Sequence, residues 1–133
     1  MNIDQQHIWA AGFLDGEGCF SIAKTFDKKY DKHRYIIRVA VSQKHEAPLK
    51  VLEKLFGGTT HFSPKQNFYQ WAVQTKLAYR MCGAVLPYLV LKQQQAVGLI
   101  SFQEDCVMFK PSRLETQDEL REEYYLMLRE MKK

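Results

Sequence analysis

The sequence has few cysteines, no long apolar run and no internal repeat, and each of these features excludes a class of protein. Its three cysteines, Cys19, Cys82 and Cys106, are odd in number and form no Cys-x-x-Cys pair, which argues against a disulfide framework or a zinc site. No apolar stretch is long enough to span a bilayer, and the N-terminus lacks the basic and apolar segments of a signal peptide. We therefore expect an intracellular protein with reduced, mostly buried thiols and no membrane contact.

Acidic residues are scarce in the middle of the chain. Residues 19–92 carry thirteen Lys or Arg against four acids, whereas residues 1–18 carry three acids and no Lys or Arg, and residues 93–133 carry six Lys or Arg against eight acids. The net charge of +4 is therefore concentrated in the centre. Such an asymmetry is typical of proteins that bind a polyanion, although a solvated basic surface gives the same pattern.

Hydrophobic periodicity predicts an α+β fold in a single domain, residues 1–133. Alternating residues predict strands over 19–26 and 34–43, separated by the charged turn 27–34, and a second hairpin of strands around Pro64-Lys65-Gln66. Helical patterns cover 5–15, 46–56, 76–86 and 88–103, and a C-terminal helix follows; Thr75 is the expected cap of the third helix, and Thr116 with Glu119 forms an expected capping box for the last. The order αββαββα predicts a four-stranded antiparallel sheet, saddle-shaped and backed by helices, with one face left free.

The first helix ends in "AAGFLDGEG", residues 10–18, and carries small residues on one stripe. Ala11, Gly12 and Asp15, with Gly16 just beyond, recur at spacings of three to four, while Trp9, Phe13 and Leu14 point toward the subunit's own core. Such a stripe allows another helix to pack close to the backbone. That helix can belong to a second chain or to the same one.

This motif resembles that of the LAGLIDADG homing endonucleases. "VSQK" (41–44) is similar to the family's strand-end glutamine segment, and "LPYLVLKQQQA" (86–96) resembles its Pro-Tyr-Leu…Lys…Gln-Ala segment. With the element order, the resemblance covers nearly the whole chain and implies the LAGLIDADG fold. Because the chain has one copy of the motif, it also implies a homodimer with Ala11, Gly12 and Asp15 at the interface.

The resemblance implies that Glu17 binds Mg²⁺ at the end of the motif helix, with the Gly16 carbonyl as a second ligand; Mn²⁺ is expected to substitute. One carboxylate per subunit suffices when DNA phosphates and waters complete the coordination of a hard cation. Lys92 and Gln43 match family positions beside the metal, and with Glu17 they are the expected catalytic residues. One departure weakens the match: some relatives have an arginine about four residues past the glutamine, where this chain has Ala47, so that Lys44 or His45 has to substitute or cleavage is weaker.

The outward parity of the strands is expected to contact double-stranded DNA. Arginines can read guanine in the major groove, while the lysines of the first turn are expected to contact phosphates. The opposite parity in the second hairpin, Phe68 and Gln70, stays open as an alternative. The expected DNA-binding residues are Ser21, Ala23, Thr25, Lys28, Lys29, Lys32, Arg34, Ile36, Arg38, Ala40, His61, Lys65, Tyr69 and Trp71.

The resulting hypothesis is an intron-homing enzyme that makes a double-strand break in a long pseudo-palindromic DNA target, with no small-molecule substrate. Two alternatives remain at this point. One is a cleavage-deficient member of the same fold that acts as an RNA-binding intron maturase or a DNA-binding regulator. The other is an unrelated α+β interaction domain whose small-residue helix packs internally. The sequence specifies neither the target site nor the host genome.

Overall fold

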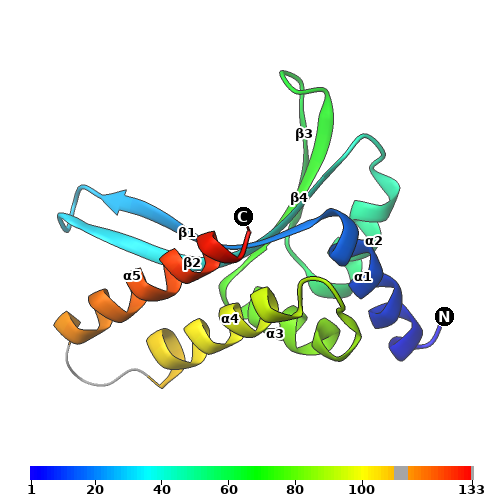
Figure 1. Ribbon diagram of the computed structural model, residues 1–133. Coiled ribbons are helices and arrows are strands. Elements are labelled where there is room, and N and C mark those ends of the chain that lie inside the picture. The colour runs from blue at the N-terminus through cyan, green and yellow to red at the C-terminus, as the bar shows by residue number, and fades with distance from the viewer. Residues whose placement is uncertain (110–113, 133) are drawn as a thin grey trace.

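The computed structural model describes residues 1–109 and 114–132, and these form one antiparallel sheet with helices packed against one of its faces (Figure 1). The elements in order are α1 (Ile3–Glu17), β1 (Gly18–Asp27), β2 (Lys32–Gln43), α2 (Ala47–Phe56), β3 (Thr59–Ser63), β4 (Phe68–Gln74), α3 (Thr75–Val85), α4 (Gln93–Gln103) and α5 (Leu114–Met131). Two short helical turns, η1 (Leu86–Tyr88) and the π-helical η2 (Glu104–Met108), follow α3 and α4.

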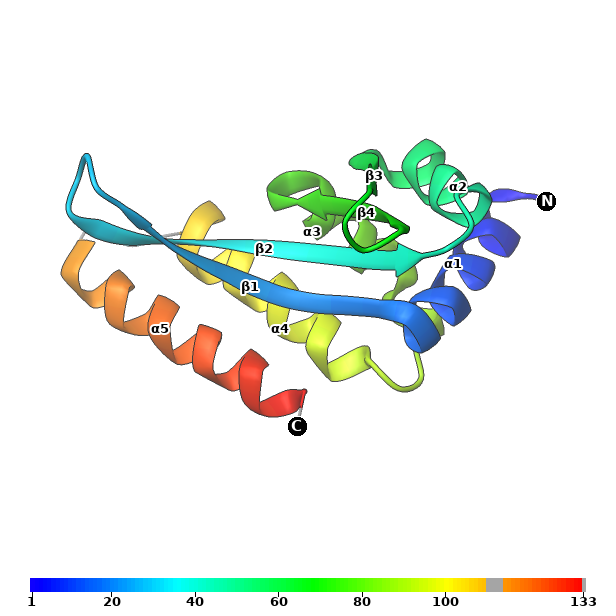
Figure 2. The same cartoon turned by 90° about the horizontal axis from the view of Figure 1, so that it is seen from above.

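The sheet confirms the predicted αββαββα arrangement. Its strand order is β1-β2-β4-β3, and all three pairings are antiparallel. The two hairpins are joined only where Arg38–Gln43 of β2 pairs with 69–74 of β4. Beyond this shared region the β1–β2 and β3–β4 hairpins diverge as two arms. The helices pack against the convex face of the sheet, opposite the concave face between the arms (Figures 1 and 2). The sheet therefore has a covered face and a concave open face.

The covered face holds the core. Alternate residues along the strands are almost completely buried there: Phe20, Ile22, Ile37, Val39, Val41, Trp71 and Val73. Leu14 of α1, Leu52 of α2 and Leu99 of α4 pack into the same cluster.

Burial of Cys82 and Cys106 raises the pKa of their thiols to about 12 and about 11, so both stay protonated, while Cys19 is exposed. Among residues 1–109 and 114–132, no helix is sufficiently long and apolar to cross a membrane.

α1 passes into β1 without a loop, which matters for the site below. The helix begins with a capping box between Asn2 and Gln5 and runs to Glu17, longer at both ends than the predicted 5–15. At Gly18, where the strand begins, an added Cβ would lie 2.8 Å from the Leu14 carbonyl oxygen, so only glycine fits this close turn. The backbone of Glu17 is thus fixed at the junction of α1 and the sheet.

Three predicted helix boundaries are wrong. α3 is capped by Gln74, and Thr75 is its first residue with a φ of 54° and makes no capping hydrogen bond. α5 begins at Leu114, so Thr116 lies within the helix and is not its N-cap; its side chain lies outside the described part of the chain. Residues 89–92 are not helical, and α4 begins only at Gln93.

An ion pair fastens α5 to the β1–β2 arm. Glu122 accepts hydrogen bonds from Lys24 Nζ and from the Tyr35 hydroxyl, both at 2.6 Å. These two bonds hold the pKa of Glu122 below its usual value, and the bond from Lys24 has the larger effect. The same bond raises the pKa of Lys24. Because the folded pKa of Glu122 is lowered, its contribution to stability is present at neutral pH and is lost as the pH falls through that value.

Replacement of Glu122 with Gln is therefore expected to lower the melting temperature at pH 7 by roughly 2–5 °C. The difference from wild type should shrink in acid, below the lowered pKa of Glu122, where the wild-type carboxyl is itself protonated. Thermal unfolding followed by circular dichroism at pH 7 and pH 3 measures both values. Glu123→Gln, at an exposed neighbouring position of α5, is the matched control. An equal loss in the two variants would contradict the role of the ion pair.

Candidate DNA-binding face and active site

The open face of the sheet carries basic, neutral polar and some apolar side chains. Among the described strands its one acid is Asp27, which is paired with Arg34 at the end of the first hairpin. Its residues, which alternate with those of the core, are Cys19, Ser21, Ala23, Thr25, Asp27, Lys32, Arg34, Ile36, Arg38, Ala40, Ser42, Thr59, His61, Ser63, Phe68, Gln70, Ala72 and Gln74. The register aligns them in rows across the strands: Ser21–Arg38–Gln74, Cys19–Ala40–Ala72–Thr59 and Ser42–Gln70–His61. A concave surface with little negative charge is suited to a phosphate backbone.

In the first hairpin the predicted parity agrees with the structure. Ser21, Ala23, Thr25, Arg34, Ile36, Arg38 and Ala40 all lie on the open face, although Ala40 is only 6% exposed. Arg34 Nε donates to Asp27 Oδ2 at 2.7 Å, so this guanidinium already has an acidic partner at the end of the arm. Arg38 makes no ion pair with any described residue. It is therefore the more available of the two arginines.

In the second hairpin the predicted parity is wrong for Trp71 and Tyr69. Trp71 is 0% exposed, and its indole N–H donates to the Gly57 carbonyl at 2.9 Å. Tyr69, two residues away on the same side, is half-buried and packs against Phe62 with the ring centroids 4.9 Å apart. A tryptophan whose N–H has a backbone acceptor can be fully buried in a core. The burial of Trp71 determines which residues of β4 face the core and which face outward. The open face of β4 instead presents the alternative residues, Phe68 and Gln70.

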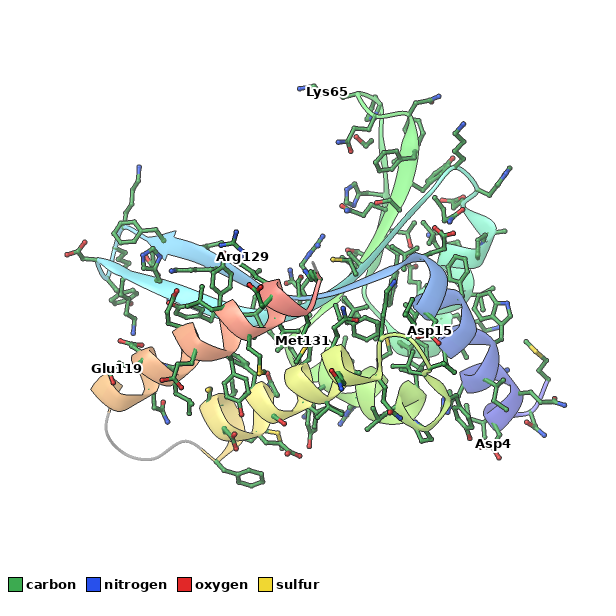
Figure 3. All side chains as sticks on the ribbon, viewed as in Figure 1. Asp4, Asp15, Lys65, Glu119, Arg129 and Met131 are labelled. Carbon is green, nitrogen blue, oxygen red and sulfur yellow. The ribbon has the colours of Figure 1, made fainter. Side chains whose placement is uncertain are left out.

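The lysines predicted to contact DNA lie at the ends of the two arms. Lys28 and Lys29 are in the exposed turn between β1 and β2, and Lys32 begins β2. Lys65 extends from the tip of the β3–β4 hairpin (Figure 3). His61 is exposed on β3 opposite Gln70. Positive charge is thus placed at both ends of the concave surface, where side chains can reach the phosphates of a duplex without reading bases.

The structure brings Lys92 to the end of α1. Its Nζ donates to the carbonyl oxygens of Gly18 at 2.6 Å and Leu14 at 3.3 Å, on either side of Gly16 and Glu17. Glu17 is exposed and its carboxylate has no hydrogen bond or ion pair with any described residue. Gln43, half-buried, ends β2 two residues beyond the pairing of Val41 with Gly18. The three predicted catalytic residues therefore come from separate elements that converge at the α1–β1 junction.

The junction can hold a hard cation. α1 ends there with no basic residue in its own last turn, and the Lys92 ammonium contacts the Leu14 and Gly18 carbonyls but not the Glu17 carboxylate. The free carboxylate of Glu17 and the Gly16 carbonyl are oxygen donors of the kind that Mg²⁺ prefers. No group of three or more His, Cys, Asp or Glu residues gathers at the junction or anywhere else in residues 1–109 and 114–132, so further ligands would have to come from outside the chain.

Two of the predicted interface residues are used inside the chain. Ala11 is 0% exposed and packs into the protein's own core together with Ala10 and Leu14. Asp15 accepts hydrogen bonds from three backbone N–H groups of the 89–92 loop. The interface prediction is therefore wrong for Ala11, and it did not foresee these contacts of Asp15. The half-buried Trp9 and Phe13 stack on each other at a centroid distance of 5.4 Å.

The exposed stripe of α1 instead runs through Ile8, Gly12 and Gly16. Ile8 is 51% exposed, and an added Cβ at either glycine would meet nothing within 4 Å. A glycine within a helix lowers stability by ~1 kcal/mol relative to alanine, and nothing inside this chain requires one at these positions. The close approach of another backbone would explain them.

The position of the family's arginine is Ala47, the first residue of α2. Ala47, Lys44 and His45 are all exposed at the start of this helix or just before it. Lys44 follows Gln43 directly and lines a small depression with Ser42 and Phe68. A lysine is therefore present beside Gln43 on the side of the open face.

Comparison with known proteins gives one family and a set of similar structures. Residues 10–95 match the family model described as LAGLIDADG endonuclease. No curated protein sequence matches the chain.

Three of the similar solved structures contain DNA. I-CvuI in complex with the I-CreI target in 2 mM Mg, with the DNA not cleaved, has a TM-score of 0.86 at 20% identity and covers 96% of this chain and 83% of its own. The archaeal I-Vdi141I complexed with DNA has a TM-score of 0.82 at 16% identity, over 96% and 84%. I-SmaMI has a TM-score of 0.68 at 15% identity and matches 87% of this chain with 42% of its own. At these identities the likeness establishes the fold.

Proposed function

Because the chain belongs to the LAGLIDADG endonuclease family, we propose that it cuts double-stranded DNA at a long, pseudo-palindromic site as a Mg²⁺-dependent homodimer. The observation that carries this proposal is the convergence of Glu17 and Lys92 at the edge of the concave face, with Lys92 Nζ 2.6 Å from the Gly18 carbonyl oxygen. A free carboxylate can hold a metal ion and an ammonium group can stabilise phosphate charge, and both are suited to phosphodiester hydrolysis.

The proposed pairing of two chains is supported by the exposed side of α1. Gly12 and Gly16 leave room for a second helix, and the neighbouring loop exposes Val90 by 88% and Leu91 by 75%. Covering these apolar side chains would stabilise a dimer. The chain has one copy of the motif and matches 42% of the longer I-SmaMI chain, which is consistent with an active unit of two such domains. A two-fold axis beside α1 would join the concave faces of the two sheets into one continuous surface.

In the proposed reaction, Glu17 and the Gly16 carbonyl hold Mg²⁺, which when bound supplies Lewis-acid activation of water and neutralises phosphate charge. Lys92, fixed by two backbone carbonyls, adds positive charge next to the scissile phosphate or orients the attacking water. Gln43 has both a donor and an acceptor and can hold a water in line with the phosphate. The open face and the lysines of the arms keep the duplex in register over these groups.

Arg38 is expected to contribute to DNA recognition more than Arg34. Its guanidinium lies on the open face between Ser21 and Gln74 without an acidic partner among the described residues, whereas Arg34 is paired with Asp27. Arg38→Ala is expected to lower affinity for the target by ~10-fold or more, since one good arginine contact is worth ~1–3 kcal/mol. Fluorescence anisotropy with target and scrambled duplexes measures the change, with Arg34→Ala as the control. A larger loss for Arg34→Ala would contradict the assignment.

Selection for cut sequences from a randomised duplex pool tests the proposed function. With Mg²⁺ or Mn²⁺ we expect one family of cut sequences with inverted half-sites and staggered ends, and none in EDTA. Tight, metal-independent binding to one duplex without cuts would favour a DNA-binding regulator. Preference for a structured intron transcript over duplex DNA would favour a maturase. A monomer without salt-sensitive affinity for duplex would overturn the family activity altogether.

A further inference from the structure

The carboxylate of Asp15 joins the motif helix to a loop that is distant in sequence. Its Oδ2 accepts from the Val90 N–H at 2.8 Å, and its Oδ1 accepts from the N–H groups of Leu91 at 3.1 Å and Lys92 at 3.0 Å. These three donors are consecutive and precede α4, which begins at Gln93. One side chain therefore satisfies three consecutive backbone donors of the loop that leads into α4.

The same loop ends in Lys92, whose side chain returns to α1. Lys92 Nζ donates to the Leu14 and Gly18 carbonyls. The backbone N–H of Lys92 donates to Asp15, so the two ends of this residue and the end of α1 form a closed ring of contacts. Lys92 makes both a backbone and a side-chain contact to the five-residue stretch 14–18. The position of its ammonium relative to Glu17 is thus determined by the contact with Asp15 as well as by its own side-chain conformation.

We propose that Asp15 is a positioning residue, which sets Lys92 for cleavage by holding the 89–92 loop against the end of α1. This inference rests on the proposed function. Asp15 is only two residues before Glu17, but its two oxygens are taken up by the loop, so it acts through Lys92 and not on the DNA or the metal. A residue of this kind typically changes activity by ~10–100-fold when it is replaced.

Both oxygens of the carboxylate are needed for all three bonds. Asparagine has the same shape but only one acceptor oxygen, and its NH₂ group would face a backbone N–H donor. Asp15→Asn should therefore preserve the helix and loosen the loop, while Asp15→Ala removes the contact entirely. Asp4→Asn, in the exposed first turn of the same helix, is the matched control.

The first measurement does not depend on cleavage. Amide hydrogen exchange of Val90, Leu91 and Lys92, followed by NMR or mass spectrometry, should become at least ~10-fold faster in Asp15→Ala and unchanged in Asp4→Asn. Exchange that stays slow in Asp15→Ala overturns the inference whether or not the protein cuts DNA. If the wild type cuts no DNA, the proposed function has failed and so has a role for Asp15 in cleavage, while the exchange rates still show whether the loop is held.

The second measurement is a double-mutant cycle on single-turnover cleavage of the selected target. Asp15→Asn is expected to slow cleavage by ~10–100-fold with target affinity within ~3-fold of wild type. In a Lys92→Met background, Asp15→Asn should slow cleavage by less than ~3-fold, because Asp15 acts through Lys92. Equal costs in both backgrounds, unchanged cleavage in Asp15→Asn, or a loss of binding that matches the loss of cleavage would each overturn the inference.

Discussion

Replacement of Glu17 with Gln is expected to slow DNA cleavage by at least ~10³-fold, since loss of the metal-binding carboxylate removes several kcal/mol of charge stabilisation in the transition state. Target affinity should stay within ~3-fold of wild type, because the open face and the arm lysines supply the DNA contacts. Glu17 is exposed and has no described partner, so the substitution breaks no contact within the fold.

Single-turnover cleavage of the selected target in Mg²⁺ measures this effect, alongside anisotropy in Ca²⁺ for binding. Glu46→Gln is a matched control, since Glu46 is also exposed and makes no capping hydrogen bond to α2. The melting temperatures of wild type and both variants should agree. Cleavage by Glu17→Gln at the wild-type rate would remove this residue from the reaction, and a loss of binding in parallel with cleavage would assign it to recognition.

Replacement of Gly12 with Leu is expected to separate the dimer without harm to the fold. An added Cβ at Gly12 meets nothing within 4 Å, and leucine in a helix is favoured over glycine by ~0.5–1 kcal/mol. The stability of a single chain should therefore hold or rise. A leucine on the exposed stripe would nevertheless keep two helices apart, and we expect the dissociation constant to rise by ~100-fold or more, as for overpacking that costs ~3 kcal/mol.

Sedimentation velocity over a range of concentrations measures the association, and thermal unfolding measures the fold. Gly83→Leu is a close control, because Gly83 is exposed within α3 and an added Cβ there also meets nothing within 4 Å. Cleavage should fall with dimer content in Gly12→Leu and persist in Gly83→Leu. A Gly12→Leu protein that still sediments as a dimer would move the interface away from α1.

Local patterns predicted the elements of the fold. Strand alternation in 19–26 and 34–43 is clear because large apolar residues dominate one parity of both segments and the arginines of 34–43 lie on the other, so the burial of Phe20, Val39 and Val41 followed from the sequence. The αββαββα order and the antiparallel sheet followed from the turns between these segments. Helix ends were less predictable: the N-cap position of α3 is Gln74, and Thr75 has a positive φ that no sequence pattern indicated.

The site could be predicted only in part because its contacts are long-range. Glu17 and Lys92 were identified through a resemblance, and the hydrogen bond between Lys92 and the Gly18 carbonyl spans 74 residues with no local signal. The hydrogen bonds of Asp15 to the 89–92 loop were missed for the same reason. In β4, Tyr69 and Trp71 were expected to contact DNA, but the strand buries Trp71, whose indole N–H has its acceptor at Gly57. Tertiary partners settled what periodicity left ambiguous.

Two chains are proposed to meet across α1 and to cut the two strands of one duplex. Native mass spectrometry of the protein on its selected target, combined with mapping of the cut on each strand, tests this proposal directly. We predict two chains per duplex and two Mg²⁺-dependent breaks related by the pseudo-two-fold of the site. One chain per duplex, or breaks on a single strand, would contradict the account.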